Sequence, residues 1–190
     1  MIDQKAQDEF FKKHWQSNIH LFKHSGENLV KVINDLKPKF VIDAGCGINF
    51  FKGKIPNLVG YDPAFKEADI MCGHFDAPFE PECADVILAL GSVNWGNSDD
   101  VAQMLIKIKS WLKPGGRLYM RGAPGGYKSD KGLKWFLWGM KEINYFARLM
   151  DFDIEWVEIE HNTTGPTGGT LPDRFWPHRY VWCYKRKLIK

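Results

Sequence analysis

Two kinds of hydrophobic pattern alternate along the first two thirds of the chain. Apolar residues recur at helical spacing over 11–22 and 29–36, and again over 101–112, where Asn97 can cap the helix start and Pro114 follows its end. Short apolar runs, typical of buried strands, lie between and after these segments. Strands that alternate with helices indicate βαβ units and a mostly parallel sheet. The predicted strands are 40–44, 58–61, 69–71, 85–90 and 117–121.

The pattern changes after about residue 133. An aromatic-rich segment predicts a helix over 133–150, followed by strands at 154–160 and 180–184. The glycine-rich loop that joins these two strands implies an antiparallel pair at the edge of the sheet. We therefore expect one domain with three parts: N-terminal helices over 1–37, a core over 38–125, and a C-terminal helix and strand pair over 126–190.

Composition narrows the class of protein. The 190 residues are 44% hydrophobic and 26% charged, with a net charge of +3, as expected for a globular domain without a strong field for nucleic acid. The four cysteines form no Cys-x-x-Cys pair, and the N-terminus shows no apolar signal region. No apolar run is long enough to span a bilayer. We therefore expect a cytoplasmic protein with no metal and no membrane partner, and leave its oligomeric state open.

Candidate chemistry concentrates at the ends of the first two strands. The run Val41-Ile-Asp43-Ala-Gly45-Cys-Gly47 ends a strand in a glycine turn, where a ligand can approach the backbone and the amides can bind an anionic group. Asp43 can hold an ammonium group or order the loop. Asp62, at the end of the second strand, stands where a carboxylate accepts hydrogen bonds from ribose hydroxyls. Glycine turns of this kind also occur for structural reasons alone.

Four segments in order, at matching spacing, resemble successive motifs of the class I S-adenosylmethionine-dependent methyltransferase family. They are Val-Ile-Asp43-Ala-Gly45-Cys-Gly47, Gly-Tyr-Asp62, Ala-Asp85-Val-Ile-Leu-Ala-Leu and Leu112-Lys-Pro-Gly-Gly-Arg-Leu. The resemblance covers roughly residues 40–121. It implies an α/β, Rossmann-like, doubly wound sheet of seven strands in the order 3-2-1-4-5-7-6, mostly parallel with the last strand antiparallel, and helices on both faces.

The same resemblance implies S-adenosyl-L-methionine as cofactor. The glycine loop would hold its methionine part, Asp62 its ribose and the segment near Phe75 and Asp76 its adenine. Asn49 stands where many members have a third glycine, and residues 49–57 are too few for a full-length first helix, as in a compact subgroup. The implied cofactor contacts are Asp43, Ala44, Gly45, Cys46, Gly47, Asn49, Asp62, Pro63, Phe75, Asp76, Leu90 and Gly91.

The acceptor side carries weaker signals. The block Gly91-Ser92-Val93-Asn94-Trp95 differs from the Asn-Pro-Pro-Tyr block that holds a planar amino group in many relatives, so nucleic-acid and glutamine acceptors lose favour. A small metabolite is favoured over RNA or protein. Candidate acceptor contacts are Trp15, Ser92, Asn94, Trp95, Arg174 and Trp176, with Trp135, Phe136 and Trp138 as further aromatic candidates. Phe11 and Trp15 on the first helix are also candidates to close over the cofactor. Candidate general bases are His74, Asp76, His161 and His178.

Two other functions compete with an active methyltransferase. A non-catalytic binding or assembly module would keep the fold and lack an acceptor motif. A nicotinamide dehydrogenase would need a third small residue where Gly45-Cys-Gly47-Ile-Asn-Phe50 places phenylalanine. Measurements of cofactor binding and of methyl transfer therefore distinguish the methyltransferase from the binding module and the dehydrogenase.

Overall fold

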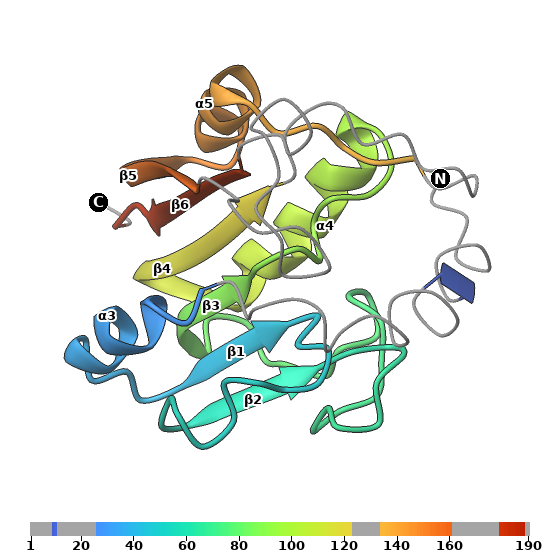
Figure 1. The fold of residues 1–190 in the computed structure, drawn as a ribbon. Helices are drawn as coiled ribbons and strands as arrows, with labels where there is room; N and C mark the ends of the chain where they lie inside the picture. Colours follow the sequence, from blue (N-terminus) through green and yellow to red (C-terminus); the bar gives the residue numbers. More distant parts are fainter. Residues whose placement is uncertain (1–8, 11–25, 123–133, 161–178, 189–190) are drawn as a thin grey trace.

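A six-stranded sheet forms the centre of the computed structural model, which describes residues 9–10, 26–122, 134–160 and 179–188 (Figure 1). The strand order is β2-β1-β3-β4-β6-β5. The strands are β1 (Val41–Ala44), β2 (Leu58–Tyr61), β3 (Ala84–Ala89), β4 (Leu112–Gly122), β5 (Phe152–Glu160) and β6 (Arg179–Arg186). The helices are α3 (Leu29–Asp35), α4 (Ser98–Trp111) and α5 (Met140–Leu149).

The pairing of the strands confirms the predicted α/β class. Strands β2, β1, β3 and β4 are parallel, whereas β6 lies antiparallel between β4 and β5. The prediction of a strand at 69–71 is wrong. In the described residues, this segment forms a single bridge, between Tyr61 and Ile70. Met71 is 57% exposed, so the segment lacks the apolar face that would extend the pairing. The described part of the chain therefore has six strands where seven were expected.

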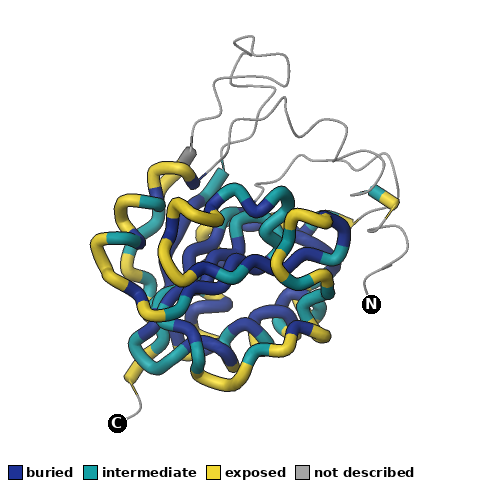
Figure 2. The backbone as a smooth tube through the Cα atoms, turned by 90° about the horizontal axis from the view of Figure 1, so that it is seen from below, coloured by how far each residue is buried: buried dark blue, intermediate teal, exposed yellow. Residues whose placement is uncertain are grey.

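Helices cover both faces of the sheet, as predicted. Val41 packs with Ile33 of α3 in one buried cluster, and its neighbour Ile42 packs with Leu105 of α4 and Phe146 of α5 in another. Successive residues of a strand point to opposite faces, so β1 contributes to both layers. The buried positions follow the strands through the middle of the molecule (Figure 2).

Helix α4 begins as its sequence predicts. The Asn97 side chain accepts hydrogen bonds from the amides of Asp99 and Asp100, and the Asp100 carboxylate accepts one from the Asn97 amide. This reciprocal cap fixes the point at which the chain leaves the loop after β3. After the helix, β4 begins at Leu112, earlier than the predicted strand at 117–121, and its register to β3 shifts between Ala84 and Val86.

The predicted helix over 133–150 begins later than expected, at Met140. Residues 134–139 are non-helical because they pair with the loop after β3, whereas Leu133 lies outside the described residues. The Phe136 amide donates to the Asn94 carbonyl at 2.8 Å, and the Trp138 indole donates to the Val93 carbonyl at 3.0 Å. Tertiary hydrogen bonds and aromatic packing therefore override the helical spacing of this segment.

The C-terminal strands form the antiparallel pair predicted for them, with β5 at the edge of the sheet. Their register shifts between Ile154 and Trp156, which marks a bulge in β5. Helix α5 packs against β5 and buries Ile143 and Phe146. No helix in the described ranges is both long and apolar enough to cross a membrane.

Candidate functional site

The candidate site lies where the parallel strands β1, β2 and β3 reach their carboxyl ends. The loops that follow these strands contain Gly45, Asp62 and Ser92, and this is the edge at which doubly wound sheets bind ligands. The fold thus brings together three of the segments that the sequence selected. Their contacts decide which groups remain available to a ligand.

The glycine turn after β1 is pressed against the loop after β3. Gly45 has φ +72°, and a Cβ added there would lie 2.5 Å from the Cβ of Ser92. Glycine is required on both counts, since a side chain would be strained and would collide with Ser92. The Gly45 and Cys46 amides donate to the Tyr61 carbonyl at 2.9 and 3.0 Å. The sequence predicted that these two amides would bind an anionic group of a ligand. Both instead donate hydrogen bonds within the protein.

Asp62 orders the turn from the end of β2. Its Oδ2 accepts a hydrogen bond from the Gly47 amide at 3.1 Å, and its Oδ1 accepts bonds from the Ala64 and Phe65 amides at 2.8 and 3.1 Å. Burial raises the pKa of this carboxyl, while the three amides favour its charged form. A carboxylate has about four acceptor positions. Asp62 therefore keeps acceptor capacity on Oδ2.

Asp43 places a second buried carboxyl beside Asp62. It is only 4% exposed, and burial together with the charge of Asp62 raises its pKa to about 7. Among the described residues, no group donates a hydrogen bond to this carboxyl. Two neighbouring acids with raised pKa values favour a positively charged ligand, because a cation offsets the cost of ionising them.

Open space lies over the glycine turn. Gly47 has φ +55°, and a Cβ added there would meet no atom within 4 Å. The φ angle explains why glycine suits this position, while the empty space gives a ligand room beside the backbone. Ala44 is buried, whereas Cys46, Pro63, Leu90 and Gly91 are half-buried around the same edge.

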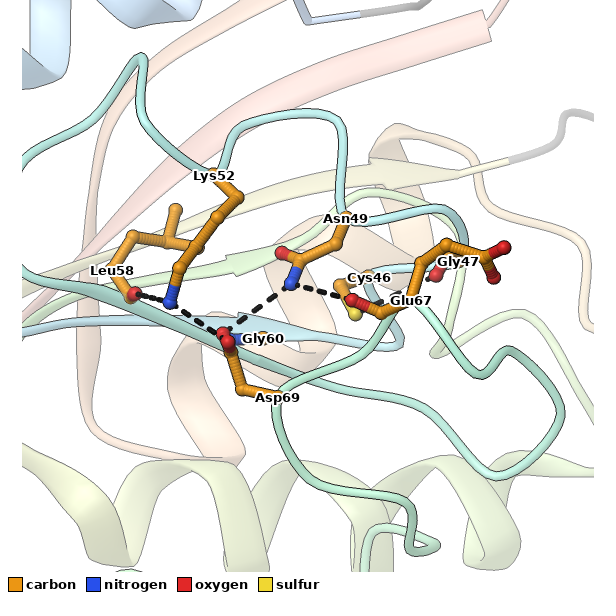
Figure 3. Close-up of polar contacts among 8 residues, drawn as sticks. All are labelled: Cys46, Gly47, Asn49, Lys52, Leu58, Gly60, Glu67 and Asp69. Carbon is orange, nitrogen blue, oxygen red and sulfur yellow. Dashed lines mark hydrogen bonds and ion pairs between the residues drawn. The ribbon is translucent and has the colours of Figure 1, made fainter.

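A polar network replaces the first helix of the fold. Residues 46–57 form turns, which confirms the predicted abbreviation, and Asn49 adopts φ +56°. The Asn49 amide donates to the Glu67 carbonyl at 3.0 Å and to Asp69 Oδ2 at 3.3 Å (Figure 3). The Asp69 carboxylate also accepts from Lys52 Nζ at 2.8 Å and from the Gly60 amide at 2.9 Å.

Asp69 is the centre of this network, and the three hydrogen bonds that it accepts, together with the charge of Lys52, outweigh desolvation and lower its pKa. The network holds the turn against β2, where Gly60 leaves no room for a Cβ beside Asn49 and Cys46. Sequence reasoning missed Asp69 and Lys52. The only sequence signal for these two residues was the short segment after the glycine turn. Because that segment is too short for a helix, side chains must hold it against the end of β2.

His74 joins the end of β2 to the loop after β3. Its Nδ1 shares a short hydrogen bond with the Tyr61 hydroxyl, and an interaction with the Ser92 backbone favours the charged form of the ring. Burial lowers the pKa of His74 to about 4. With Nδ1 engaged by Tyr61 and the ring buried, the geometry favours a positioning role over that of a general base. The neighbouring Asp76 is exposed, and Phe75 is 58% exposed, which leaves its ring face accessible for stacking.

The loop after β3 carries two buried polar atoms without partners. Ser92 Oγ and Asn94 Oδ1 are both covered and accept no hydrogen bond. Leaving such an atom unpaired costs about 1–3 kcal/mol. Trp95, on the same loop, contacts Trp135 with a ring separation of 4.0 Å, and Phe10 packs against both rings.

The structure leaves several predicted residues untested. Within the described ranges, no three His, Cys, Asp or Glu side chains are arranged to hold a metal ion. The candidates Phe11, Trp15, His161, Arg174, Trp176 and His178 lie outside the described residues.

Comparison with known families identifies the central part of the chain. Residues 42–120 match the family model described as a methyltransferase domain. The chain is also 22% identical over 142 residues to phosphoethanolamine N-methyltransferase 1 of Triticum aestivum. That alignment covers 64% of this chain and 26% of the wheat protein, so the chain spans about a quarter of the relative that it matches.

Solved structures share the fold at low sequence identity. One is the 1,6-didemethyltoxoflavin-N1-methyltransferase of Burkholderia thailandensis, with a TM-score of 0.72 and 14% identity, covering 96% of this chain and 87% of that one. Another is the magnesium protoporphyrin IX methyltransferase of Synechocystis, with a TM-score of 0.69 and 12% identity, covering 97% and 100%. At these identities the likeness establishes the fold.

Proposed function

We propose that the chain, whose residues 42–120 match a methyltransferase domain, is a class I S-adenosylmethionine-dependent methyltransferase that methylates a small-molecule acceptor. The observation that supports this most directly is the pair of buried carboxyls, Asp43 and Asp62, at the glycine turn. Their raised pKa values suit a cofactor that carries positive charge on both its sulfur and its amino group.

The residues around the turn fit this cofactor. Asp62 keeps an acceptor position for a ribose hydroxyl, and Asp43 offers a carboxylate to a cationic group. Gly47 leaves open space beside the backbone. Phe75 offers its exposed ring face to the adenine. We assign cofactor contacts to Asp43, Ala44, Gly45, Cys46, Gly47, Asn49, Asp62, Pro63, Phe75, Asp76, Leu90 and Gly91.

Catalysis by this site would consist mainly of orientation. Bound S-adenosylmethionine supplies a methyl group on a positively charged sulfur, which is open to in-line displacement. The protein aligns the two reactants and keeps water away, which can supply much of the rate enhancement. Gly45 contacts Ser92, so the cofactor turn and the proposed acceptor loop meet at one point. The assigned acceptor contacts in the described residues are Ser92, Asn94 and Trp95.

A small acceptor is supported by the composition of the chain and by the names of its relatives. Those names refer to phosphoethanolamine, 1,6-didemethyltoxoflavin and magnesium protoporphyrin IX, which are all small molecules. The net charge of +3 is too small to suggest a nucleic-acid acceptor. All four cysteines are free, which supports a reducing compartment such as the cytoplasm.

Cofactor binding tests the site directly. We expect Asp62→Ala to lower the affinity for S-adenosylmethionine by at least about tenfold in isothermal titration calorimetry. The substitution removes the carboxylate that three backbone amides bond and a hydrogen-bond acceptor for the cofactor. Asp35→Ala, an exposed acid on α3 paired only with Lys31, is the matched control and should bind normally. Equal affinities for wild type and Asp62→Ala would mean that the site is misplaced.

Activity requires a second measurement. Labelled methyl groups should pass from the cofactor into a cell extract, and the label should stay in the small-molecule fraction after nuclease and protease treatment. Cofactor binding with no transfer to any fraction would support a non-catalytic binding module. A preference for NAD over S-adenosylmethionine in a thermal-shift assay would contradict the proposal.

A further inference from the structure

We propose that the acceptor atom is an amine nitrogen carrying at least two hydrogens, held by Ser92 Oγ and Asn94 Oδ1. This rests on the proposed methyl transfer and narrows it to one class of acceptor. The loop after β3 holds both side-chain atoms, and each is buried without a hydrogen-bond partner. A buried acceptor left unpaired is unfavourable, so a ligand that donates hydrogen bonds to both atoms would gain from each.

The orientation of Asn94 makes its free atom an acceptor. Its amide nitrogen donates to the Arg121 carbonyl at 3.5 Å, so the unpaired atom of the carboxamide is its oxygen. The side chain is 5% exposed, so bulk water does not satisfy that oxygen. A carboxamide oxygen cannot donate. Whatever pairs with Asn94 Oδ1 must therefore bring its own hydrogen.

The loop that carries both atoms is held in place before any ligand binds. The Phe136 amide donates to the Asn94 carbonyl at 2.8 Å, and the Gly96 amide donates to the Lys134 carbonyl at 2.7 Å. Trp95 packs against Trp135 between these two hydrogen bonds. The unpaired atoms are thus part of a fixed arrangement, which is what a preorganised binding site requires.

The same atoms lie beside the proposed cofactor turn. The Cβ of Ser92 is 2.5 Å from the position that a Gly45 Cβ would occupy, so this side chain touches the turn after β1. An acceptor bound to Ser92 is therefore placed at the junction of the cofactor and acceptor loops.

Two unpaired acceptors on one loop favour a primary amine over an alcohol. An amine offers two N–H donors to two acceptors and keeps a lone pair for the methyl group, whereas a hydroxyl has one donor. In the transfer, the nitrogen lone pair forms the N–C bond as the S–C bond breaks, and its electrons return to sulfur. The resulting ammonium group then releases a proton to water. A neutral amine needs no general base, which agrees with the engagement of His74 Nδ1 by Tyr61.

The product identifies the acceptor atom. Wild-type protein is incubated with trideuteromethyl S-adenosylmethionine and the small-molecule fraction of a nuclease- and protease-treated extract, and the labelled product is fragmented by mass spectrometry. We expect the label on nitrogen. Label on oxygen, sulfur or carbon would overturn this inference and leave the proposed methyltransferase function intact. A protein that binds the cofactor and labels nothing would overturn both.

Variants test the two side chains separately. We expect Asn94→Leu to raise the KM of the labelled amine by about tenfold or more, and Ser92→Ala to raise it less, because each removes one hydrogen-bond acceptor. Asn94→Asp keeps an acceptor oxygen and should restore amine binding. The affinity of each folded variant for S-adenosylmethionine, measured by calorimetry, should stay within about twofold of wild type.

Controls distinguish binding from folding. Asn144→Ala changes an exposed amide that bonds only the Met140 carbonyl of α5, and it should leave KM and kcat unchanged. An Asn94→Leu protein with normal cofactor affinity and unchanged amine KM would overturn the inference. If Asn94→Leu fails to fold, Ser92→Ala and Asn94→Asp provide the same comparison at the same loop.

Discussion

The turn after β1 and the loop after β3 meet at Gly45 and Ser92, yet they treat their polar groups differently. In the turn, three successive amides and the Asp62 carboxylate bond within the protein. In the loop, Ser92 Oγ and Asn94 Oδ1 are buried and unpaired, although the backbone around them is held by hydrogen bonds and aromatic packing. The polar groups of the turn are thus bonded within the protein, whereas the two unpaired atoms of the loop are left for a ligand to bond.

The turn and the loop are suited to bind a ligand in two different ways. The turn offers charge and space, since Asp43 and Asp62 are buried acids and Gly47 borders an opening. The loop offers hydrogen-bond acceptors on a rigid support. Changes in the turn should therefore act on cofactor affinity, whereas changes in the loop should act on the acceptor.

The largest effect should follow a substitution at the junction of the two regions. Gly45→Ala brings a Cβ to 2.5 Å from Ser92 at φ +72°, so the turn must move. We expect cofactor affinity to fall by about 100-fold or more in calorimetry, by analogy with the strong effect of small displacements in active sites. Gly53→Ala is the matched control, because Gly53 has φ +77° but no neighbouring atom. Equal losses in both variants would assign the effect to backbone strain alone.

Cofactor affinity should also depend on pH through Asp43. Its pKa of about 7 in the free protein means that a proton must leave before the carboxylate can meet a cation. We expect S-adenosylmethionine to bind more tightly as pH rises from 5.5 to 7, by up to about tenfold per pH unit, and to level off above that. Calorimetry in buffers of different ionisation enthalpy measures the released proton. Asp43→Asn should remove the pH dependence, and a persistent slope would assign it to another group.

The same group sets a trend in the stability of the free protein. The folded pKa of Asp43 lies above its ordinary value of 3.8, so the folded chain binds a proton that the unfolded chain has already released between about pH 4 and 7. The contribution of Asp43 to stability is therefore greatest at low pH and is lost as pH rises through about 7. We expect Asp43→Asn to be more stable than wild type at pH 8 in urea denaturation. Equal stability at that pH would contradict the burial argument.

A smaller effect should follow a change in the aromatic support of the acceptor loop. Trp135→Leu removes the ring that contacts Trp95 and Phe10, while cofactor contacts are left alone. We expect the unfolding free energy to fall by about 2–3 kcal/mol and the acceptor KM to rise, with cofactor affinity unchanged. Leu137→Ala, an exposed neighbour, is the control. A matching loss of cofactor affinity in Trp135→Leu would show that the two regions are not separable.

The smallest effect should come from the network that replaces the first helix. Asp69→Asn removes the ion pair with Lys52, whose side chain is 52% exposed, and keeps the shape of the Asp69 side chain. We expect less than about 1 kcal/mol of destabilisation and a cofactor affinity within about threefold of wild type. Lys31→Ala, which removes an exposed pair with Asp35, gives the baseline. An effect as large as that of Gly45→Ala would mean that the turn depends on this network.

Sequence patterns predicted the elements whose signals are local. Strand β1 is a short apolar run, and helix α4 has an apolar face and an Asn97 cap, so both were located within a residue or two. The extended segment 134–139 was misplaced because its pairing with residues 94–96 joins parts of the chain that are remote in sequence. The same limit applies to the site: Gly45 and Asp62 follow strands directly, whereas the hydrogen bond between His74 and Tyr61 arises only when the loop after β2 folds back against that strand.

The edge strand β5 has a consequence for association. Within the described part of the chain, no strand pairs with its outer side along Phe152–Glu160, which leaves the backbone groups of a sheet edge there. A second copy adding there would meet the bulge at Ile154 and Trp156 and exposed carboxylates at Asp153 and Glu158. Interrupted register and repulsion between like charges discourage edge-to-edge pairing. The strand that completes the sheet is thereby shaped to prevent aggregation along it.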